Sequence, residues 1–128
     1  MRCLVSLLTP LIAAAPAFAQ EWHIAPEYDV LLTNNDFKPA VIHLKANEPV
    51  RLRFVNNSEQ PHRFSAAAFF RSAQLRGRDR DLVRGGSIRV APLSDETIAL
   101  VPKAGRYKVT GDNLFRRVLG MSATIVVE

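Results

Sequence analysis

Two segments of this chain carry residues that could bind a metal ion. His62 follows Pro61 in a polar segment, Phe54–Phe64, which comes directly after a predicted strand. Met121 lies in a second segment of the same kind, Gly105–Val127, which has the pattern of a strand, a polar loop and a strand. Imidazole and thioether are donors that suit Cu(I). The sequence therefore predicts that any metal chemistry lies in these two loops.

The strand before the first loop has the clearest pattern in the chain. Residues 50–55 (VRLRFV) alternate apolar and basic side chains. The apolar residues Val50, Leu52 and Phe54 should therefore face a core, and the arginines between them should face water. Further short strands are predicted over residues 28–33, 40–44, 63–68, 87–90, 97–101, 106–110 and 122–127. Proline, glycine and asparagine separate them, and only residues 69–75 have a helical pattern. This arrangement predicts an all-β fold, an antiparallel sandwich or Greek-key barrel.

The N-terminus has the pattern of a secretory signal peptide. It begins with a basic residue, continues through an apolar run and ends on Ala17-Phe18-Ala19, a small-x-small cleavage signal. The alternative is a membrane anchor, but prolines interrupt a run already shorter than the roughly 20 apolar residues that a spanning helix needs. We therefore expect residues 1–19 to be removed, residues 20–27 to form a lead-in, and residues 28–128 to form one monomeric periplasmic domain.

Loss of the signal would remove the only cysteine, Cys3. An exported chain may contain disulfides, but this one could form none after cleavage. The mature domain would also lack a thiolate for metal binding or catalysis. We expect no enzyme activity, because there is no glycine-rich phosphate loop and Ser65, near His62, lacks the Gly-x-Ser-x-Gly turn of a nucleophile.

The formal net charge of +5 is partly concentrated in one arginine-rich stretch, Arg71–Arg89. Its part up to Gly85 and Gly86 is predicted to be a long loop. Its candidate partner-binding residues are Arg71, Arg76, Arg78, Arg80 and Arg84, to which the second loop adds Arg116 and Arg117. A solvated basic loop, an acidic protein partner and a membrane surface or metal-handling membrane protein are the alternatives. We expect no nucleic-acid binding, since no aromatic residues interleave these arginines.

Several motifs, in their order along the chain, resemble the cupredoxin family of the plastocyanin and azurin type. They are Phe37-Lys38-Pro39, the strand 50–55, Pro61-His62, Ala104-Gly105-Arg106-Tyr107 and Gly120-Met121. The resemblance covers nearly all of the chain after the signal. It implies a Greek-key β-sandwich with a copper ion between two loops. One histidine ligand would come from the first loop, and cysteine, histidine and methionine from the second.

Two of those four ligands are missing here. The resemblance places His62 and Met121 at the first and last ligand positions, but Gly111 stands where cysteine is expected. No histidine occurs after His62. Blue-copper electron transfer depends on a short copper–thiolate bond supported by two imidazoles. We therefore interpret the site as a degenerate type 1 copper site.

Two roles remain for this loop pair. His62 and Met121 could hold Cu(I) weakly, with Asp112 or water completing the site; alternatively, His62 hydrogen-bonds within its loop and Met121 fills a gap. The leading hypothesis is an exported accessory protein in copper or other metal handling without blue-copper redox chemistry. The alternative is a non-catalytic periplasmic module that binds a partner through its arginine-rich loop.

Overall fold

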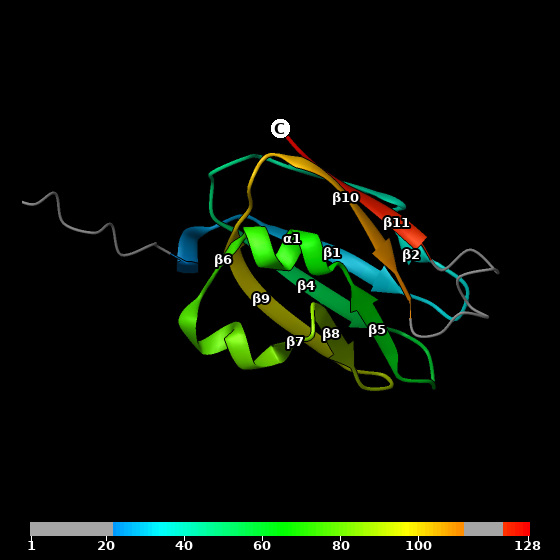
Figure 1. Cartoon of the computed structure of the whole chain (residues 1–128). Helices are drawn as coiled ribbons and strands as arrows, with labels where there is room; N and C mark the ends of the chain where they lie inside the picture. The colour runs from blue at the N-terminus through cyan, green and yellow to red at the C-terminus, as the bar shows by residue number, and fades with distance from the viewer. Residues whose placement is uncertain (1–21, 112–121) are drawn as a thin grey trace, which may run out of the picture.

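The computed structural model describes residues 22–111 and 122–128, which form two β-sheets packed face to face (Figure 1). The five-stranded sheet has the order β2-β1-β4-β9-β6. Its strands are β1 (Glu27–Leu32), β2 (Phe37–Lys38), β4 (Val50–Asn56), β6 (Gln74–Leu75) and β9 (Asp95–Val101).

The six-stranded sheet has the order β3-β11-β10-β5-β8-β7. Its strands are β3 (Val41–Leu44), β5 (His62–Ser65), β7 (Val83–Arg84), β8 (Ser87–Val90), β10 (Gly105–Thr110) and β11 (Ser122–Val127). The predicted all-β sandwich is confirmed. Two pairings, β1 with β4 and β3 with β11, are parallel rather than antiparallel, because the chain changes sheets between the paired strands.

The core lies between the sheets and follows the alternation predicted for β4. Val50, Leu52 and Phe54 are buried, whereas the arginines between them are half-buried on the outer face. The Phe64 ring packs against Phe54 at a centroid distance of 4.7 Å and edge-on against Phe37 at 5.4 Å. Aromatic rings from both sheets thus meet next to the strand that carries His62.

The helical segments among the described residues are short and lie before or between the strands. Helix α1 (Ala67–Ser72) begins two residues before the helical segment predicted from the sequence. The described residues also form two 3-10 helices, η1 (Trp22–Ile24) and η2 (Gly77–Leu82). Among the described residues, no helix is long and apolar enough to cross a bilayer.

The arginine-rich stretch is more ordered than the long loop predicted from the sequence. It contains η2 and then the hairpin β7–β8, whose two-residue turn is Gly85-Gly86 with φ of 58° and 74°. Positive φ at both turn residues matches the twist of a β-hairpin and favours glycine. A Cβ on Gly86 would also lie 2.6 Å from Ala67, so the hairpin packs directly against helix α1.

Candidate functional site

The loop that leads to His62 is held by one buried side chain, Asn56. Its Nδ2 donates to the carbonyl oxygens of Gln60 at 2.7 Å, Val90 at 3.1 Å and Ala91 at 3.2 Å. Its Oδ1 accepts from the backbone N–H of Ser58 at 2.9 Å and from the Ser58 hydroxyl at 2.8 Å. Asn56 is 1% exposed and Ser58 is 8% exposed. This Asn56 cluster joins the end of β4 to the end of β8.

His62 begins β5 directly after this loop, opposite Val90 in the β5–β8 register. Its side chain points into the sandwich and is fully buried. The Nε2 atom lies 3.4 Å from Oδ1 of Asn34, in the connection between β1 and β2. A buried imidazole needs polar partners, because burying an unpaired polar group is costly. The fold therefore holds His62 between the Asn56 cluster and the β1–β2 connection.

The strands that flank the second predicted loop adjoin β5, the strand that carries His62. Thr110, the last residue of β10, pairs with Ser122 on β11 and with Ser65 on β5. Because β10 runs antiparallel to β5, Gly111 follows Thr110 on the side of Ser65 that leads toward Phe64 and His62. The register thus places the strand ends that flank the loop near Ser65, the last residue of the strand that begins at His62.

Four residues singled out from the sequence lie outside the described part of the chain: Met121, Asp112, Arg116 and Arg117. Within residues 22–111 and 122–128, no three His, Cys, Asp or Glu side chains group as they would around a metal ion. The His62–Met121 pair therefore stays a prediction.

Three of the arginines predicted to bind a partner, Arg76, Arg78 and Arg84, line two different hollows. Arg76 donates through Nε to Asp79 at 2.7 Å, and Asp79, which is 3% exposed, also accepts from the backbone N–H of Ala99 at 2.8 Å. Asp79 thus binds the backbone of β9 just beyond the end of β6, so the Arg76–Asp79 pair has a structural role at this edge of the five-stranded sheet. Arg78 lines a hollow together with Arg76, whereas Arg84 lines a different one.

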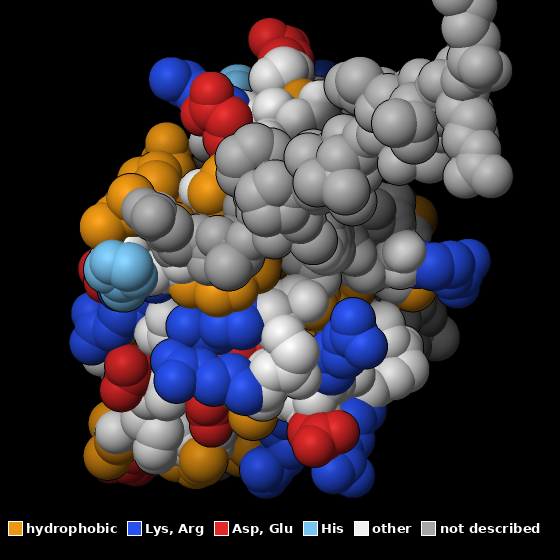
Figure 2. Space-filling model, turned by 90° about the vertical axis from the view of Figure 1, so that its left-hand side faces the viewer, with side chains coloured by type: hydrophobic (Ala, Val, Ile, Leu, Met, Phe, Trp, Pro, Cys, Tyr) orange, Lys and Arg blue, Asp and Glu red, His pale blue; other side chains and the backbone are white. Residues whose placement is uncertain are grey.

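Figure 2 shows the end of the molecule that carries η1. Blue Lys and Arg side chains gather near its centre with red acidic side chains between them. The hollow on this side is lined by Trp22, His23, Arg51, Arg76 and Arg78. Two of its three arginines already pair with carboxylates: Arg76 with Asp79, and Arg51 with Glu27 at 3.6 Å. Most of the positive charge here is therefore neutralised within the fold.

Comparison with known proteins agrees with this architecture. The family model of the cupredoxin-like domain matches residues 3–127. The chain belongs to the cupredoxin-like family. Auracyanin B is similar in structure, with a TM-score of 0.55 and 18% identity over 81% of this chain and 89% of that chain. Reduced auracyanin from the photosynthetic bacterium Roseiflexus castenholzii gives a TM-score of 0.56 and 14% identity over 81% and 97% of the two chains. No curated protein sequence matches significantly.

Membership of the family does not bring its blue-copper chemistry. Gly111, at the position where the resemblance places the cysteine ligand, is buried and has no side chain that could bind a metal. The chain's one cysteine, Cys3, is remote in sequence from both loops. Without a thiolate, the short copper–sulfur bond of a type 1 site cannot form. The residues present therefore do not fit type 1 copper.

The side chains that support His62 were not predicted from the sequence. Asn56-Asn57-Ser58 contains an Asx-turn signal, because an asparagine side chain commonly accepts a hydrogen bond from the backbone two residues later. That pattern could have predicted the contact from Ser58. The contact of Asn34 with His62 has no local signal, because the two residues are 28 positions apart.

Proposed function

We propose that this protein is an exported, non-enzymatic accessory in copper or other metal handling, without electron-transfer chemistry. The observation that carries the proposal is the fully buried imidazole of His62, held at the loop end of a cupredoxin-like sandwich. His62 and Met121 would hold the metal ion. The signal-peptide pattern of residues 1–19 supports export to the periplasm.

The donor types decide which ion such a site would favour. One imidazole and one thioether are soft or borderline donors, and Cu(I) tolerates low coordination numbers. A hard dication such as Mg²⁺ or Ca²⁺ requires several oxygen ligands, and no carboxylate cluster is found among the described residues. Low coordination also makes the ion easy to release, which suits transfer to another protein better than storage.

Titration of the purified mature protein with Cu(I) under reducing conditions tests this function. We expect stoichiometric binding that is lost in both His62→Ala and Met121→Leu. His43→Ala is the matched control, because His43 is exposed on β3 and should not affect binding. Absence of binding, or equal loss in the His43 variant, would remove the proposal. No intense visible thiolate-to-copper band is expected with Cu(II).

A second candidate function is non-catalytic binding of an acidic protein. The observation that favours it is the set of exposed cations that make no ion pair with any described residue. Association that weakens as salt concentration rises would support this role, since exposed charges are screened within about 10 Å at 0.1 M salt. Association that is insensitive to salt would contradict it.

A further inference from the structure

The two sheets differ sharply in the charges on their strands. The five-stranded sheet carries both signs, and its outward charges pair across strands. Arg53 lies 3.5 Å from Asp29 and 3.0 Å from Asp95. The hydrogen bond from Arg53 to Asp95, followed by the attraction of that carboxylate, raises the pKa of the guanidinium. Both arginines on β4, Arg51 and Arg53, are therefore paired with carboxylates within the fold.

The six-stranded sheet, as the structure describes it, carries cations alone. None of its strands contains Asp or Glu. Its outward basic residues are Arg63 on β5, Arg84 on β7, Arg89 on β8, and Arg106 and Lys108 on β10. We call these five residues the basic sheet face. β10, β5, β8 and β7 are consecutive neighbours, so the face spans three strand spacings, about 14 Å.

Within this face, two arginines oppose each other directly. Arg63 on β5 is the register partner of Arg89 on β8, and both are exposed on the outer side. Like charges directly opposite on antiparallel strands destabilise a sheet. Neither arginine forms an ion pair with any described residue. The pair thus costs stability when the protein is free, and an anion bound between the two would relieve that cost.

Two hollows on the face provide places for such anions. One, of about 290 Å³, is lined by Arg63, Arg84 and Arg89, with Ser87, Asp81 and Leu82. Arg84 donates through Nε to the backbone oxygen of Asp81 at 3.1 Å, which fixes the base of its guanidinium. Three arginines and one aspartate thus line the same hollow. The hollow keeps an excess of positive charge.

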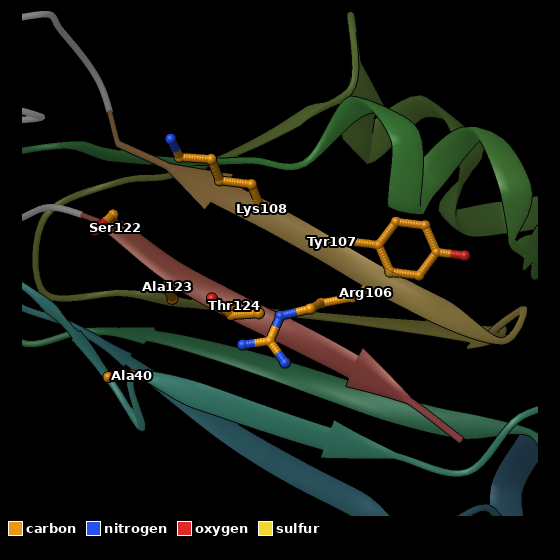
Figure 3. A pocket seen from close by; sticks show the side chains of 7 residues that line it. All are labelled: Ala40, Arg106, Tyr107, Lys108, Ser122, Ala123 and Thr124. Carbon is orange, nitrogen blue, oxygen red and sulfur yellow. The ribbon is translucent and has the colours of Figure 1, made fainter.

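The other hollow, of about 510 Å³, lies over β10 and β11 (Figure 3). Arg106 extends over β11 beside Thr124, and Lys108 rises from the same strand as Arg106. The hydroxyls of Ser122 and Thr124 line the same space. Hydroxyl donors next to cations suit carboxylate oxygens, and a guanidinium can donate two parallel hydrogen bonds to one carboxylate.

From these observations we propose that the basic sheet face docks an acidic protein, whose carboxylates enter the two hollows. Charge complementarity identifies this occupant. A membrane surface fits less well, because Val41 and Leu82 are the only large exposed apolar side chains near these hollows among the described residues. A single-stranded nucleic acid would need free aromatic rings for base stacking, and Tyr107, the aromatic side chain that lines one of these hollows, already packs its ring against Phe69 at a centroid distance of 5.4 Å.

This inference rests on the binding role and is independent of the metal role, since the face lies on the outer side of the sheet and His62 points inward. The experiment measures binding of a fluorescent poly-L-glutamate peptide to the whole mature protein over a range of salt concentrations. The test variant is Arg63→Gln/Arg89→Gln. The control is Arg71→Gln/Arg78→Gln, which removes the same charge from exposed positions outside the face.

We expect Arg63→Gln/Arg89→Gln to weaken peptide binding about tenfold or more, because it removes two charge partners at one hollow. The control should stay within about twofold of the wild type. Thermal unfolding provides the second readout: removing the opposed like charges should leave the midpoint unchanged or raise it, so lost binding would not reflect lost folding.

Three results would overturn the inference. The control variant could lose as much affinity as the test variant, which would show that net charge alone is sensed. The control could lose more, which would place docking on the arginine-rich stretch and leave the binding role intact. Phosphatidylglycerol vesicles or a single-stranded oligonucleotide could bind more tightly than the peptide, with the same dependence on Arg63 and Arg89.

Discussion

Replacement of Asn56 by aspartate tests whether a buried hydrogen-bond cluster holds the loop that carries His62. The two side chains have nearly the same shape, so the change replaces an NH₂ donor by an oxygen and little else. The oxygen Oδ1 can still accept from the N–H and hydroxyl of Ser58. The new oxygen would face the carbonyl oxygens of Gln60, Val90 and Ala91, to which Nδ2 now donates.

The loss of stability can be estimated from these contacts. The NH₂ group has two hydrogens for three acceptors, so about two net hydrogen bonds are lost, worth about 1 kcal/mol each. Leaving a buried carbonyl such as that of Val90 without its side-chain donor and opposed to an anionic oxygen costs about 2 kcal/mol more. The total, about 4 kcal/mol, is a large part of the 5–15 kcal/mol typical of a folded domain.

The effect should also depend on pH in a defined direction. Burial and the facing carbonyl oxygens disfavour the charged form, so the pKa of the new carboxyl should be higher in the folded state than in the unfolded state. The protonated acid can donate one hydrogen bond and is tolerated better. Stability relative to wild type is therefore highest below the unfolded pKa of about 3.9 and falls as pH rises through the folded pKa.

Urea unfolding of wild type, Asn56→Asp and Asn56→Ala at about pH 4 and about pH 7.5 would measure this. The alanine variant is the matched control, because it loses the same donors and has no titrating group. Its deficit relative to wild type should be similar at both pH values. The reasoning about the cluster is refuted if Asn56→Asp shows a deficit below about 1 kcal/mol at neutral pH, or one that does not change with pH.

Three further substitutions test other parts of the structure by the free energy of unfolding. Asp79→Ala should cost about 3 kcal/mol, because it leaves the half-buried guanidinium of Arg76 unpaired; a loss under about 1 kcal/mol would show the pair to be dispensable. Gly86→Ala should cost more than Gly85→Ala, since both have positive φ but only Gly86 lacks room for a Cβ; equal costs would contradict the packing on α1. Tyr107→Phe should cost about 1 kcal/mol through the lost 2.8 Å bond to a backbone carbonyl, and calorimetry would detect no shift if that bond is unimportant.

The sequence predicted the strands best where the chain alternates regularly. Strands β8 and β11 have the predicted bounds, and β4 is one residue longer than predicted. Alternation is a local signal, because successive side chains of a strand face the core and the solvent in turn. The very short strands β2, β6 and β7 were not predicted, because two residues carry no period and their pairing depends on distant partners.

The arginine-rich stretch shows why composition alone misled the local prediction. A run of arginines with two aspartates resembles a solvated loop. However, Asp79 enters the fold to accept from Ala99, 20 residues further along the chain, and its partner Arg76 is thereby half-buried. A contact at that separation has no sequence signal. The two arginines that oppose each other on the basic sheet face, Arg63 and Arg89, lie on different strands. Only the strand register shows that they are opposite each other.

The candidate site separates the architecture of a cupredoxin from its chemistry. The Asn56 cluster satisfies backbone groups at the end of β8 and in the loop between β4 and β5, so it stabilises the sandwich whether or not a metal is bound. Selection for folding alone would retain it. A metal ligand such as a thiolate contributes mainly to the metal site, and the strand pairing of Thr110 forms here with glycine at position 111. A cupredoxin-like fold with a buried His62 therefore does not require a type 1 copper centre, and the function follows from the ligands and charged surfaces that this chain has.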